Sequence, residues 1–342
     1  MQKILVTGDK GYIGSVLVSK LLDKGYEVVG LDTGFFDKCL IKGKKDLNYR
    51  KIKKDVRNIE KKDLTGIDAI IHLSALSNDP MGEVDPKLTK EINYKASIRL
   101  AKLAKKSGVK RFLFSSSCSI YGIAKNGIVD EKSKINPLTA YAESKIKTEK
   151  ALMKLASKDF VVGLLRNSTV YGFSSRFRND LVVNNLVTTA LAFGEIRIMS
   201  DGTPWRPLID VRDLSDIFIK FLETKKTISG KVINIGFNEN NFQVKDLVSV
   251  VGKQLPKCKI TYTGEHGSDT RSYKVKFDLF KKLFPEIKQK WTIDKSVENM
   301  VVELAKTGYS KKNFEAKTYS RLAVLKNLLD EKKIDKNLYW IR

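Results

Sequence analysis

A tyrosine and a lysine four positions apart, Tyr141 and Lys145, combine residue types and a spacing that suit proton transfer. On a helix this spacing places both side chains on one face. A phenol with a pKa of about 10 is a poor base at neutral pH, but a neighbouring ammonium stabilises the phenolate and lowers that pKa. Alone, the pattern is common on helix surfaces. A serine-rich run, Ser115 to Ser119, precedes it, and a hydroxyl there can orient a substrate oxygen.

A glycine-rich turn near the start of the chain is a second motif that bears on the role of the tyrosine and lysine. Gly8, Gly11 and Gly14 stand between an apolar segment and a helical pattern. In such a turn the first glycine permits the tight bend, the second lets the backbone approach a pyrophosphate, and the third lets the helix pack on the sheet. The unpaired N–H groups of the helix then face the phosphates. The sequence therefore predicts a dinucleotide site.

Two carboxylates follow the next strands and refine that prediction. Asp32 closes the second strand, 18 residues after Gly14. A carboxylate at this point accepts hydrogen bonds from ribose hydroxyls and repels a 2′-phosphate, which favours NAD over NADP. Asp55, followed by Val56, comes after the third strand, where a carboxylate can meet the adenine amino group. Considered alone, Asp55 is also typical of a helix cap.

The elements that must position these groups alternate between strand and helix. Strands are expected at residues 3–7, 27–32, 49–53, 69–73, 111–115, 161–166, 231–235 and 259–262. Helices are expected at 12–22, 88–106, 140–157, 181–192 and 244–254. Apolar strands that alternate with amphipathic helices indicate an α/β fold with a doubly wound parallel sheet. We expect residues 1–172 and 206–236 to form the dinucleotide domain, and 173–205 and 237–342 to form a smaller C-terminal substrate-binding lobe.

Composition and charge exclude several classes of protein. The chain has 342 residues, of which 42% are hydrophobic and 30% charged, as in soluble globular proteins of about two domains. No apolar run approaches the roughly 20 residues that span a bilayer. The N-terminus runs straight into a strand, so no secretory signal is expected. Three scattered cysteines and two histidines argue against a disulfide framework and against a bound metal. These features fit the cytoplasm.

The formal net charge of +25 raises the question of a nucleic-acid or membrane partner. The lysines are spread along the whole chain, and no basic stretch carries interleaved aromatic residues. We interpret the charge as a solvated lysine-rich surface, so neither nucleic acid nor membrane is expected as a partner. The charge can still steer an anionic small substrate towards its site.

Taken together, the motifs resemble those of the extended short-chain dehydrogenase/reductases, in the NAD-dependent nucleotide-sugar epimerase/dehydratase branch that includes the UDP-glucose/galactose 4-epimerases. The resemblance covers nearly the whole chain and implies a Rossmann sheet. It also rests on His72 to Ala75, Asn93, Ser117 to Gly122, Leu165 to Gly172, Asn184 to Leu186, Asp201 to Arg206 and Asp269 to Arg271.

The resemblance implies roles for individual residues. Ser117, Tyr141 and Lys145 would be the catalytic triad, with Tyr141 taking the proton of a sugar hydroxyl and Lys145 holding the nicotinamide ribose. Cofactor contacts are implied for Gly8, Gly11, Tyr12, Ile13, Gly14, Asp32, Asp55, Val56, Leu73, Ala75, Asn93, Tyr141 and Lys145. Substrate contacts are implied for Ser117, Thr169, Asn185, Arg206 and Arg271, and arginine suits a diphosphate because of its planar, permanently charged fork.

Some positions depart from the pattern of particular family members. UDP-galactose 4-epimerases carry Asn where this chain has Thr169 and Lys where it has Ser77, which leaves the sugar open. The family's 4,6-dehydratases and UDP-glucuronate decarboxylases usually carry an acidic residue just after the triad hydroxyl, where this chain has Cys118 and Ser119. We expect Cys118 to be a small buried residue.

The expected function is NAD-dependent epimerisation of a nucleotide-diphosphate sugar, through transient oxidation to a keto-sugar and re-reduction. One alternative is a keto-sugar reductase or dehydrogenase of the same family. An alternative of another class is a non-catalytic NAD-binding regulator or an RNA-associated protein. We expect His72 to be structural, and His266, in a glycine-rich loop, indicates nothing. The resemblance also implies a homodimer through the helices around 88–106 and 140–157.

Overall fold

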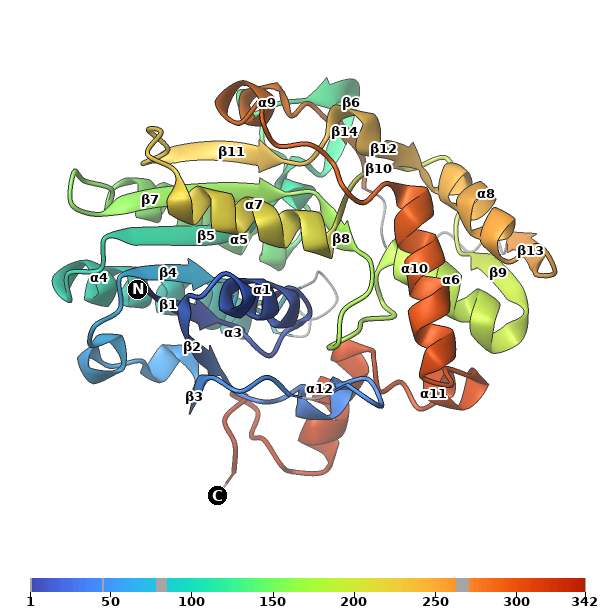
Figure 1. The fold of residues 1–342 in the computed structure, drawn as a ribbon, viewed down its shortest axis with the longest axis horizontal. Coiled ribbons are helices and arrows are strands. Elements are labelled where there is room, and N and C mark those ends of the chain that lie inside the picture. Colours follow the sequence, from blue (N-terminus) through green and yellow to red (C-terminus); the bar gives the residue numbers. More distant parts are fainter. Residues whose placement is uncertain (1, 45, 78–84, 263–270, 342) are drawn as a thin grey trace.

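A computed structural model describes residues 2–44, 46–77, 85–262 and 271–341 of the chain. Its centre is a seven-stranded sheet in the order β11-β7-β5-β4-β1-β2-β3, and all neighbouring strands are parallel (Figure 1). The strands are β1 (Lys3–Thr7), β2 (Glu27–Asp32), β3 (Arg50–Lys53), β4 (Ala69–His72), β5 (Arg111–Ser117), β7 (Val161–Asn167) and β11 (Lys231–Ile235). The predicted α/β fold with a parallel sheet is confirmed.

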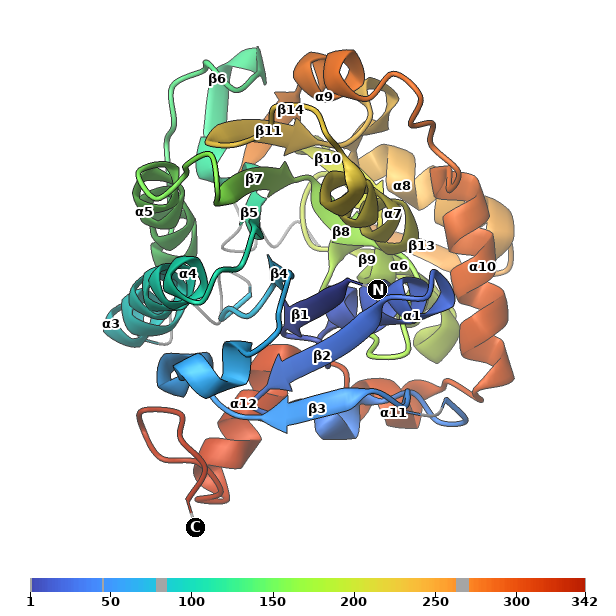
Figure 2. The same ribbon diagram turned by 60° about the vertical axis from the view of Figure 1, so that its left-hand side comes forward.

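Helices cover both faces of the sheet because successive strand side chains point to opposite sides. On one face, Ile4 and Val6 of β1 pack with α1 (Tyr12–Asp23), α7 (Val211–Glu223) and α9 (Asp278–Leu283). On the other face, Leu5 packs in a core with α4 (Ala96–Lys106) and α5 (Ala140–Met153). Figure 2 shows α4 and α5 on one side of the sheet and α1 and α7 on the other.

A second core lies beside the carboxyl edge of the sheet. It is built around α6 (Val182–Phe193), α8 (Val244–Gln254) and α10 (Ile293–Lys306), with β9 (Glu195–Ile198) packed against them. Small sheets complete this region: β8 (Thr169–Tyr171) with β10 (Trp205–Asp210) and β12 (Asn241–Gln243), β9 with β13 (Lys259–Tyr262), and β6 (Ile123–Val129) with β14 (Ser272–Val275). The short helix α11 (Lys311–Glu315) leads to the last helix, α12 (Arg321–Asp330).

The helix expected at 88–106 is built from three pieces. It starts as α3 (Pro86–Thr89), continues through a π-helical turn, η4 (Lys90–Lys95), and ends as α4. The helix expected at 140–157 ends earlier, at Met153. Short 3-10 turns lie at η1 (Asp37–Cys39), η2 (Val56–Asn58), η3 (Lys61–Leu64), η5 (Cys118–Tyr121) and η6 (Asn238–Asn240).

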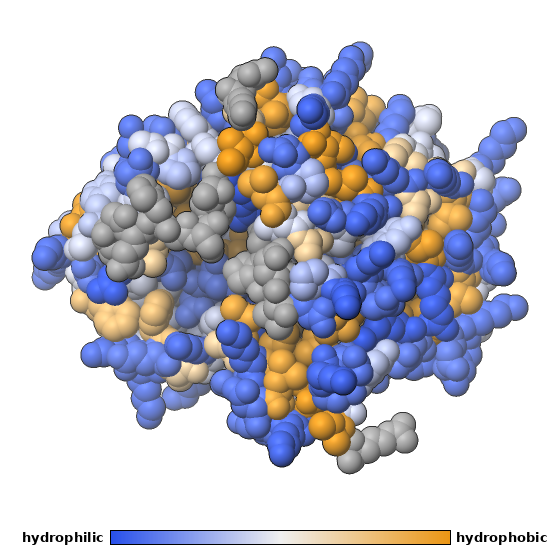
Figure 3. All heavy atoms as spheres, turned by 180° about the vertical axis from the view of Figure 1, so that it is seen from behind, coloured by the Kyte–Doolittle hydropathy of each residue, from blue (hydrophilic) through white to orange (hydrophobic). Residues whose placement is uncertain are grey.

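Seen from behind, hydrophilic side chains cover most of that face, and apolar residues form separate patches between them (Figure 3). None of the described helices combines the length and the apolar character needed to cross a bilayer.

Candidate active site

A cavity of about 1140 Å³ opens at the carboxyl ends of the parallel strands. Ligands of doubly wound sheets bind at this edge, where the loops that follow neighbouring strands diverge. The turn after β1, the ends of β2 and β3, and the segments after β4, β5 and β7 all contribute lining residues. Arg206 of β10 and Arg271 line the cavity as well. The cavity is therefore shared between the large sheet and segments outside it.

The glycine turn is shaped so that only backbone lines this part of the cavity. Gly8 has φ +74°, and a Cβ there would lie 3.0 Å from the backbone nitrogen of Ser74. A Cβ on Gly14 would lie 2.1 Å from the carbonyl oxygen of Gly8, so the first turn of α1 packs directly on the loop. Gly11 caps α1 without a side-chain hydrogen bond. The N–H groups in the first turn of α1, which have no intrahelical acceptor, fit a dinucleotide diphosphate.

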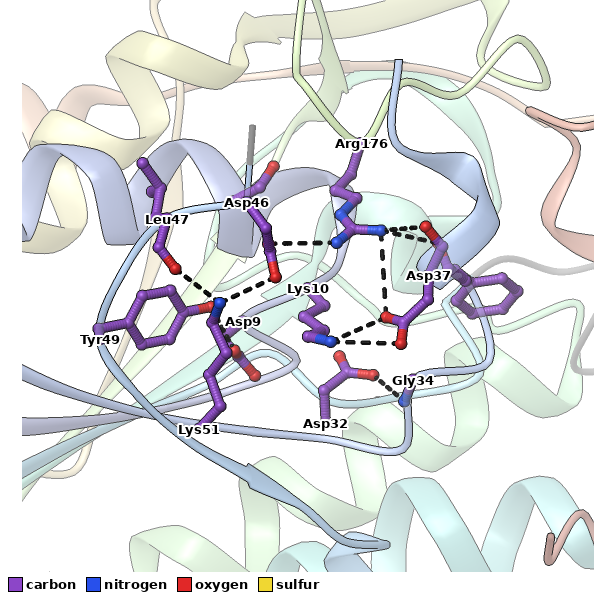
Figure 4. A network of polar contacts seen from close by, with 12 residues as sticks. Asp9, Lys10, Asp32, Gly34, Asp37, Asp46, Leu47, Tyr49, Lys51 and Arg176 are labelled. Atoms are coloured by element: carbon purple, nitrogen blue, oxygen red, sulfur yellow. Dashed lines mark hydrogen bonds and ion pairs between the residues drawn. The ribbon is translucent and has the colours of Figure 1, made fainter. Parts of the chain in front are cut away.

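The end of β2 carries a carboxylate whose surroundings disfavour a further phosphate (Figure 4). Asp32 lines the cavity and accepts a hydrogen bond of 2.7 Å from the N–H of Gly34. The nearby ammonium of Lys10 is held by both oxygens of Asp37, at 3.0 and 3.2 Å. Burial, together with the charge of Asp32, raises the pKa of Asp9 to about 7. This acidic corner suits the ribose hydroxyls of NAD.

Asp55 caps a 3-10 turn, and its contact with adenine stays a prediction. It lines the cavity, and its side chain caps η2 by accepting a hydrogen bond of 2.7 Å from the N–H of Arg57. The Arg57 guanidinium also pairs with both carboxylate oxygens of Asp55. The carboxylate is therefore fixed in place before any ligand arrives.

Ser117, Tyr141 and Lys145 lie together on the cavity wall, at the end of β5 and in the first turns of α5. Thr139 starts α5 by accepting a hydrogen bond of 3.2 Å from the N–H of Ala142. The Lys145 ammonium lies 5.4 Å from the ring centroid of Tyr141 and donates a 2.7 Å hydrogen bond to the carbonyl of Ser115. The structure thus brings the three expected groups to one place.

The electrostatics of Lys145 depend on a buried network behind it. Burial lowers the pKa of the Lys145 ammonium to about 7, and the negative charge of Glu149 acts in the opposite direction. Glu149 stands one helical turn further along α5, where it pairs with both the Nε and Nη2 atoms of Arg166. The hydroxyl of Ser116 also donates to it. Glu149 therefore links Arg166 and Ser116 behind the lysine, although it does not line the cavity.

The residues after Ser117 provide no acidic group. Cys118 is fully buried, donates its S–H to the carbonyl of Arg166 and has a pKa that burial raises. Ser119 lines the cavity, and its N–H donates to the Ser117 hydroxyl at 3.1 Å. The expectation that Cys118 is a small buried residue is confirmed.

The cavity lining matches most of the residues implied by the family resemblance. It includes Gly8, Gly11, Tyr12, Ile13, Gly14, Asp32, Asp55, Val56, Leu73, Ala75, Ser117, Tyr141, Lys145, Thr169, Arg206 and Arg271. His72 is a buried structural residue, as expected, hydrogen-bonded to the hydroxyls of Thr7 (2.6 Å) and Ser97 (2.7 Å). His266 and Asp269 fall outside the described residues.

Two expected contact residues do not line the cavity. The side chain of Asn93 is buried in the π-helical turn, where it accepts from the N–H and donates to the carbonyl of Leu76. Asn93 therefore fixes the cavity-lining segment after β4 from behind. The amide of Asn185 donates 3.0 Å to the carbonyl of Asn179, which fixes a neighbouring loop instead. In both cases the side-chain amide hydrogen-bonds to backbone groups of a neighbouring segment.

The cavity-lining residues that were not predicted from the sequence include Arg178, Asp180 and Arg321. Arg178 and Asp180 form a two-pronged ion pair, and Arg178 also donates to the hydroxyl of Ser77 at 3.2 Å. The run Arg176-Phe177-Arg178-Asn179-Asp180 was a visible sign of such a pair. No local motif marked Arg321.

Comparisons with known proteins agree with this site. Residues 4–236 match the model of the NAD dependent epimerase/dehydratase family. The UDP-glucose 4-epimerase of Bacillus subtilis is 30% identical over 285 residues, which are 74% of this chain and 83% of the relative. The chain belongs to the NAD-dependent epimerase/dehydratase family.

Solved structures support the same assignment. The UDP-glucuronic acid 4-epimerase from Bacillus cereus, solved with UDP-glucuronic acid and NAD, has a TM-score of 0.76 and 26% identity, over 89% of this chain and 99% of its own. TunA, described as an NAD-dependent NDP-hexosamine 5,6-dehydratase, has a TM-score of 0.78 at 22% identity over 90% and 98%, which shows the shared fold. This protein is an enzyme of a nucleotide-sugar family whose cofactor is NAD.

Proposed function

We propose that this enzyme epimerises a nucleotide-diphosphate sugar by transient oxidation to a keto-sugar and re-reduction. One observation carries the proposal: Ser117, Tyr141 and Lys145 share one cavity with the glycine turn, and the positions after Ser117 hold no carboxylate. Epimerisation needs a reversible base and a bound nicotinamide, whereas elimination of water needs further acid–base groups.

The residues divide the chemistry as follows. Tyr141 removes the proton from a sugar hydroxyl and later returns it, and the Ser117 hydroxyl hydrogen-bonds the same oxygen. The ammonium of Lys145, close to the Tyr141 ring, favours the phenolate that must form. When bound, NAD accepts the hydrogen of the carbinol carbon as hydride and gives it back. Inversion requires the keto-sugar to present its opposite face before re-reduction.

The carboxylates of the cavity argue against a dehydratase. Among the described lining residues these are Asp32, Asp55 and Asp180. Asp32 and Asp55 lie at the ends of β2 and β3, where the adenosine half of NAD is expected. Burial alone would raise the pKa of Asp180, but the charge and hydrogen bonds of Arg178 bring it below the ordinary value. A carboxylate held ionised in this way is a poor proton donor for a leaving hydroxyl.

The substrate end of the cavity suits an anionic nucleotide sugar. Arg206 is buried and lines the wall next to Arg271, and the Arg206 guanidinium donates to the backbone carbonyl of Arg271. Two arginines so close together favour the two charges of a diphosphate. Relatives named UDP-glucose 4-epimerase and UDP-glucuronate 4-epimerase make UDP-sugars the first substrates to test.

A panel of UDP-, GDP-, CDP- and dTDP-sugars, incubated with the enzyme and NAD in deuterated water, tests the proposal. We expect an isomer of unchanged mass and no net NADH for at least one UDP-sugar. Loss of water with solvent deuterium at C5, the carbon that must lose and regain a proton, would instead identify a 4,6-dehydratase. A stoichiometric change in NADH would identify a ketoreductase or dehydrogenase.

We also propose that the enzyme is a homodimer. The outer face of α4 carries a groove of about 430 Å³, lined by Tyr94, Lys95, Ile98, Arg99, Lys102, Leu103 and Lys106. Half-buried Ile98 and Leu103 give this groove an apolar floor that a second copy would cover.

A further inference from the structure

The C-terminal segment, residues 320–341, packs over the dinucleotide half of the cavity. Leu325 and Leu328 of α12, with Ile334 and Leu338 after it, form one buried cluster with Leu76, Leu88 and Ile92. Phe35 and Phe36, which follow β2, pack against the same cluster. Figures 1 and 2 both place α12 beside β2 and β3. The end of the chain therefore bridges the loops after β2 and β4.

Directional contacts fasten this segment to the residues expected around adenosine. The Arg57 guanidinium, which also holds Asp55, donates to the carbonyls of Asn337 (2.8 Å) and Leu338 (3.2 Å). The indole N–H of Trp340 donates 2.7 Å to the carbonyl of Thr33, next to Asp32. The C-terminal segment is therefore attached beside Asp32, at the end of β2, and beside Asp55, after β3.

Arg321, the first residue of α12, lines the cavity and is only 2% exposed. Its Nη2 atom donates 2.7 Å to the carbonyl of Arg176, and its guanidinium lies 4.9 Å from the ring centroid of Phe36. Its Nη1 atom is buried and has no hydrogen-bond partner within the described part of the chain. A buried polar atom without a partner is costly unless a ligand satisfies it.

The two neighbouring arginines each form an ion pair with a carboxylate. Arg176 pairs with Asp46 at 3.3 Å, and Arg178 pairs with Asp180 at 2.8 Å. The described partners of Arg321 are a carbonyl and an aromatic ring, and the carboxylate of Asp180, which acts on Arg321 through its charge, is already paired with Arg178. Burial lowers the pKa of Arg321, the charges of Arg178 and Arg176 act in the same direction, and the charge of Asp180 acts against them. An anion in the cavity would relieve both the unpaired charge and the unpaired donor.

The contacts of Arg321 indicate which anion this is. Arg176, whose carbonyl holds Arg321, donates its N–H to the hydroxyl of Ser174. That hydroxyl donates 2.8 Å to the carbonyl of Tyr12, the first residue of α1. Arg321 is therefore linked through Arg176 and Ser174 to the start of α1, where the dinucleotide diphosphate is expected.

We propose that Arg321 binds the diphosphate of NAD, and that the segment 320–341 is a built-in cover that slows release of the cofactor. The glycine turn would hold the diphosphate from one side through backbone N–H groups, and Arg321 from the other through its guanidinium. The proposal depends on NAD binding alone and not on the reaction proposed above.

The test measures NAD binding to the full chain after removal of the co-purified cofactor. A charge-assisted hydrogen bond lost from a buried site weakens binding by about 10- to 100-fold. We expect Arg321→Gln to raise the dissociation constant of NAD by this factor, and Arg321→Lys to raise it less. Lys326→Ala removes an exposed cation from the same helix and should change nothing. UDP, the second probe, should bind all four proteins equally.

Unchanged NAD affinity in Arg321→Gln would overturn the proposal. Weaker UDP binding with normal NAD binding would assign Arg321 to the nucleotide sugar instead. Trp340→Ala tests the cover separately, because it removes the bond to Thr33 and leaves Arg321 in place. We expect NAD to leave this variant about tenfold faster, corresponding to one lost neutral hydrogen bond and its packing. Equal rates of NAD release from Trp340→Ala and from the parent enzyme would overturn the proposal that residues 320–341 slow this release.

Melting temperatures without NAD show whether the variants remain folded. If Arg321→Gln fails to fold, Arg321→Lys and Trp340→Ala still decide the matter through NAD affinity and release rate. Both properties can be measured whether or not any sugar is epimerised, so a failure here is distinct from a failure of the proposed function.

Discussion

Tyr141 carries the proton in the proposed reaction, so its hydroxyl should be needed for rate and not for folding. Tyr141→Phe keeps the ring and its place in the first turn of α5. Loss of a general base costs about 10²- to 10⁴-fold in rate. We expect kcat to fall by this factor while NAD affinity stays near that of the parent enzyme. Near-normal turnover of the phenylalanine variant would remove Tyr141 from the mechanism.

Lys145 should affect both rate and cofactor affinity, with a characteristic pH dependence. Its folded pKa of about 7 is far below the ordinary value, so the free enzyme loses the ammonium as pH rises through about 7. If NAD binds the ammonium form, its affinity falls up to tenfold for each pH unit above that value. Titrations of NAD from pH 6 to 9 should show this fall.

The matched variants for this titration are Lys145→Met and Lys147→Met. Lys147 is exposed on the same helix and paired with Glu143, so its loss should change neither affinity nor pH profile. Lys145→Met should bind NAD weakly and show a flatter profile. Asp9 also titrates at about pH 7, and the comparison separates its contribution because both variants retain it. An unchanged profile in Lys145→Met would assign the pH dependence to another group.

Asp32 should set the preference for NAD over NADP. Its carboxylate lies in an acidic corner where Lys10 is already paired with Asp37, so a 2′-phosphate meets repulsion without a compensating cation. We expect tighter binding of NAD than of NADP by fluorescence quenching. Asp32→Ala should narrow the difference, because it removes both the ribose hydrogen bond and the repulsion. Tighter NADP binding by the parent enzyme would contradict this prediction.

Residues that act through local backbone shape were predictable from the sequence. The glycine turn and the pair Tyr141 and Lys145 lie within short windows, so their spacing marked them as candidates, and the combination of motifs along the chain gave them their expected roles. Arg321 reaches the cavity only because α12 folds back across the loops after β2 and β4. A contact made by a segment so distant in the chain leaves no periodic or motif signal.

At the scale of elements, the sheet was predictable because its central strands are nearly continuous apolar runs, although the edge strand β3 is mostly polar. The bounds of β1, β2, β11 and β13 agree with those expected from the sequence. The π-helical turn at η4 was not predictable, because its apolar residues continue the ordinary helical pattern on both sides. It frees the carbonyl of Asn93 to accept from the hydroxyls of Ser97 and Thr148. Such turns are frequent at functional sites.

The junction of β1, β4 and α4 should make folding stability depend on pH through His72. Burial lowers the pKa of His72 to about 3, so the folded state excludes a proton that the unfolded chain takes up below about 6.5. The free energy of unfolding should therefore fall by about 1.4 kcal/mol for each pH unit below that value, reaching about 2 kcal/mol at pH 5. Urea unfolding between pH 7 and 4 measures this slope.

His72→Gln provides the comparison for that slope. Glutamine offers one donor and one acceptor group towards Thr7 and Ser97 without the ionisable ring. Asp9 acts in the opposite direction between about pH 4 and 7, because its raised pKa favours the folded state on acidification. The difference in the free energy of unfolding between the parent enzyme and His72→Gln isolates the contribution of His72. If the two proteins show the same dependence of stability on pH, another group is responsible for it.

At the scale of the whole molecule, the cavity is lined by segments from both parts of the predicted division. The division into residues 1–172 with 206–236 and 173–205 with 237–342 stays a prediction. Two segments of its second part, α9 and α12, pack against residues of the first part. Their amphipathic patterns show that one face is buried but not which partner buries it, so the sequence could not place them.

The net charge of +25 should control the proposed dimer. Two copies that meet through α4 bring Lys95, Arg99, Lys102 and Lys106 together around an apolar floor. Screening lengths shorten from about 30 Å at 0.01 M salt to about 10 Å at 0.1 M, so salt weakens the repulsion more than the apolar contact. We expect sedimentation equilibrium to show tighter dimers at about 0.1 M salt than at about 0.01 M.

Leu103→Glu should give monomers at both salt concentrations. Val302→Glu, on the exposed face of α10, should leave the dimer unchanged. Monomers at every salt concentration, or dimers that survive Leu103→Glu, would exclude this interface.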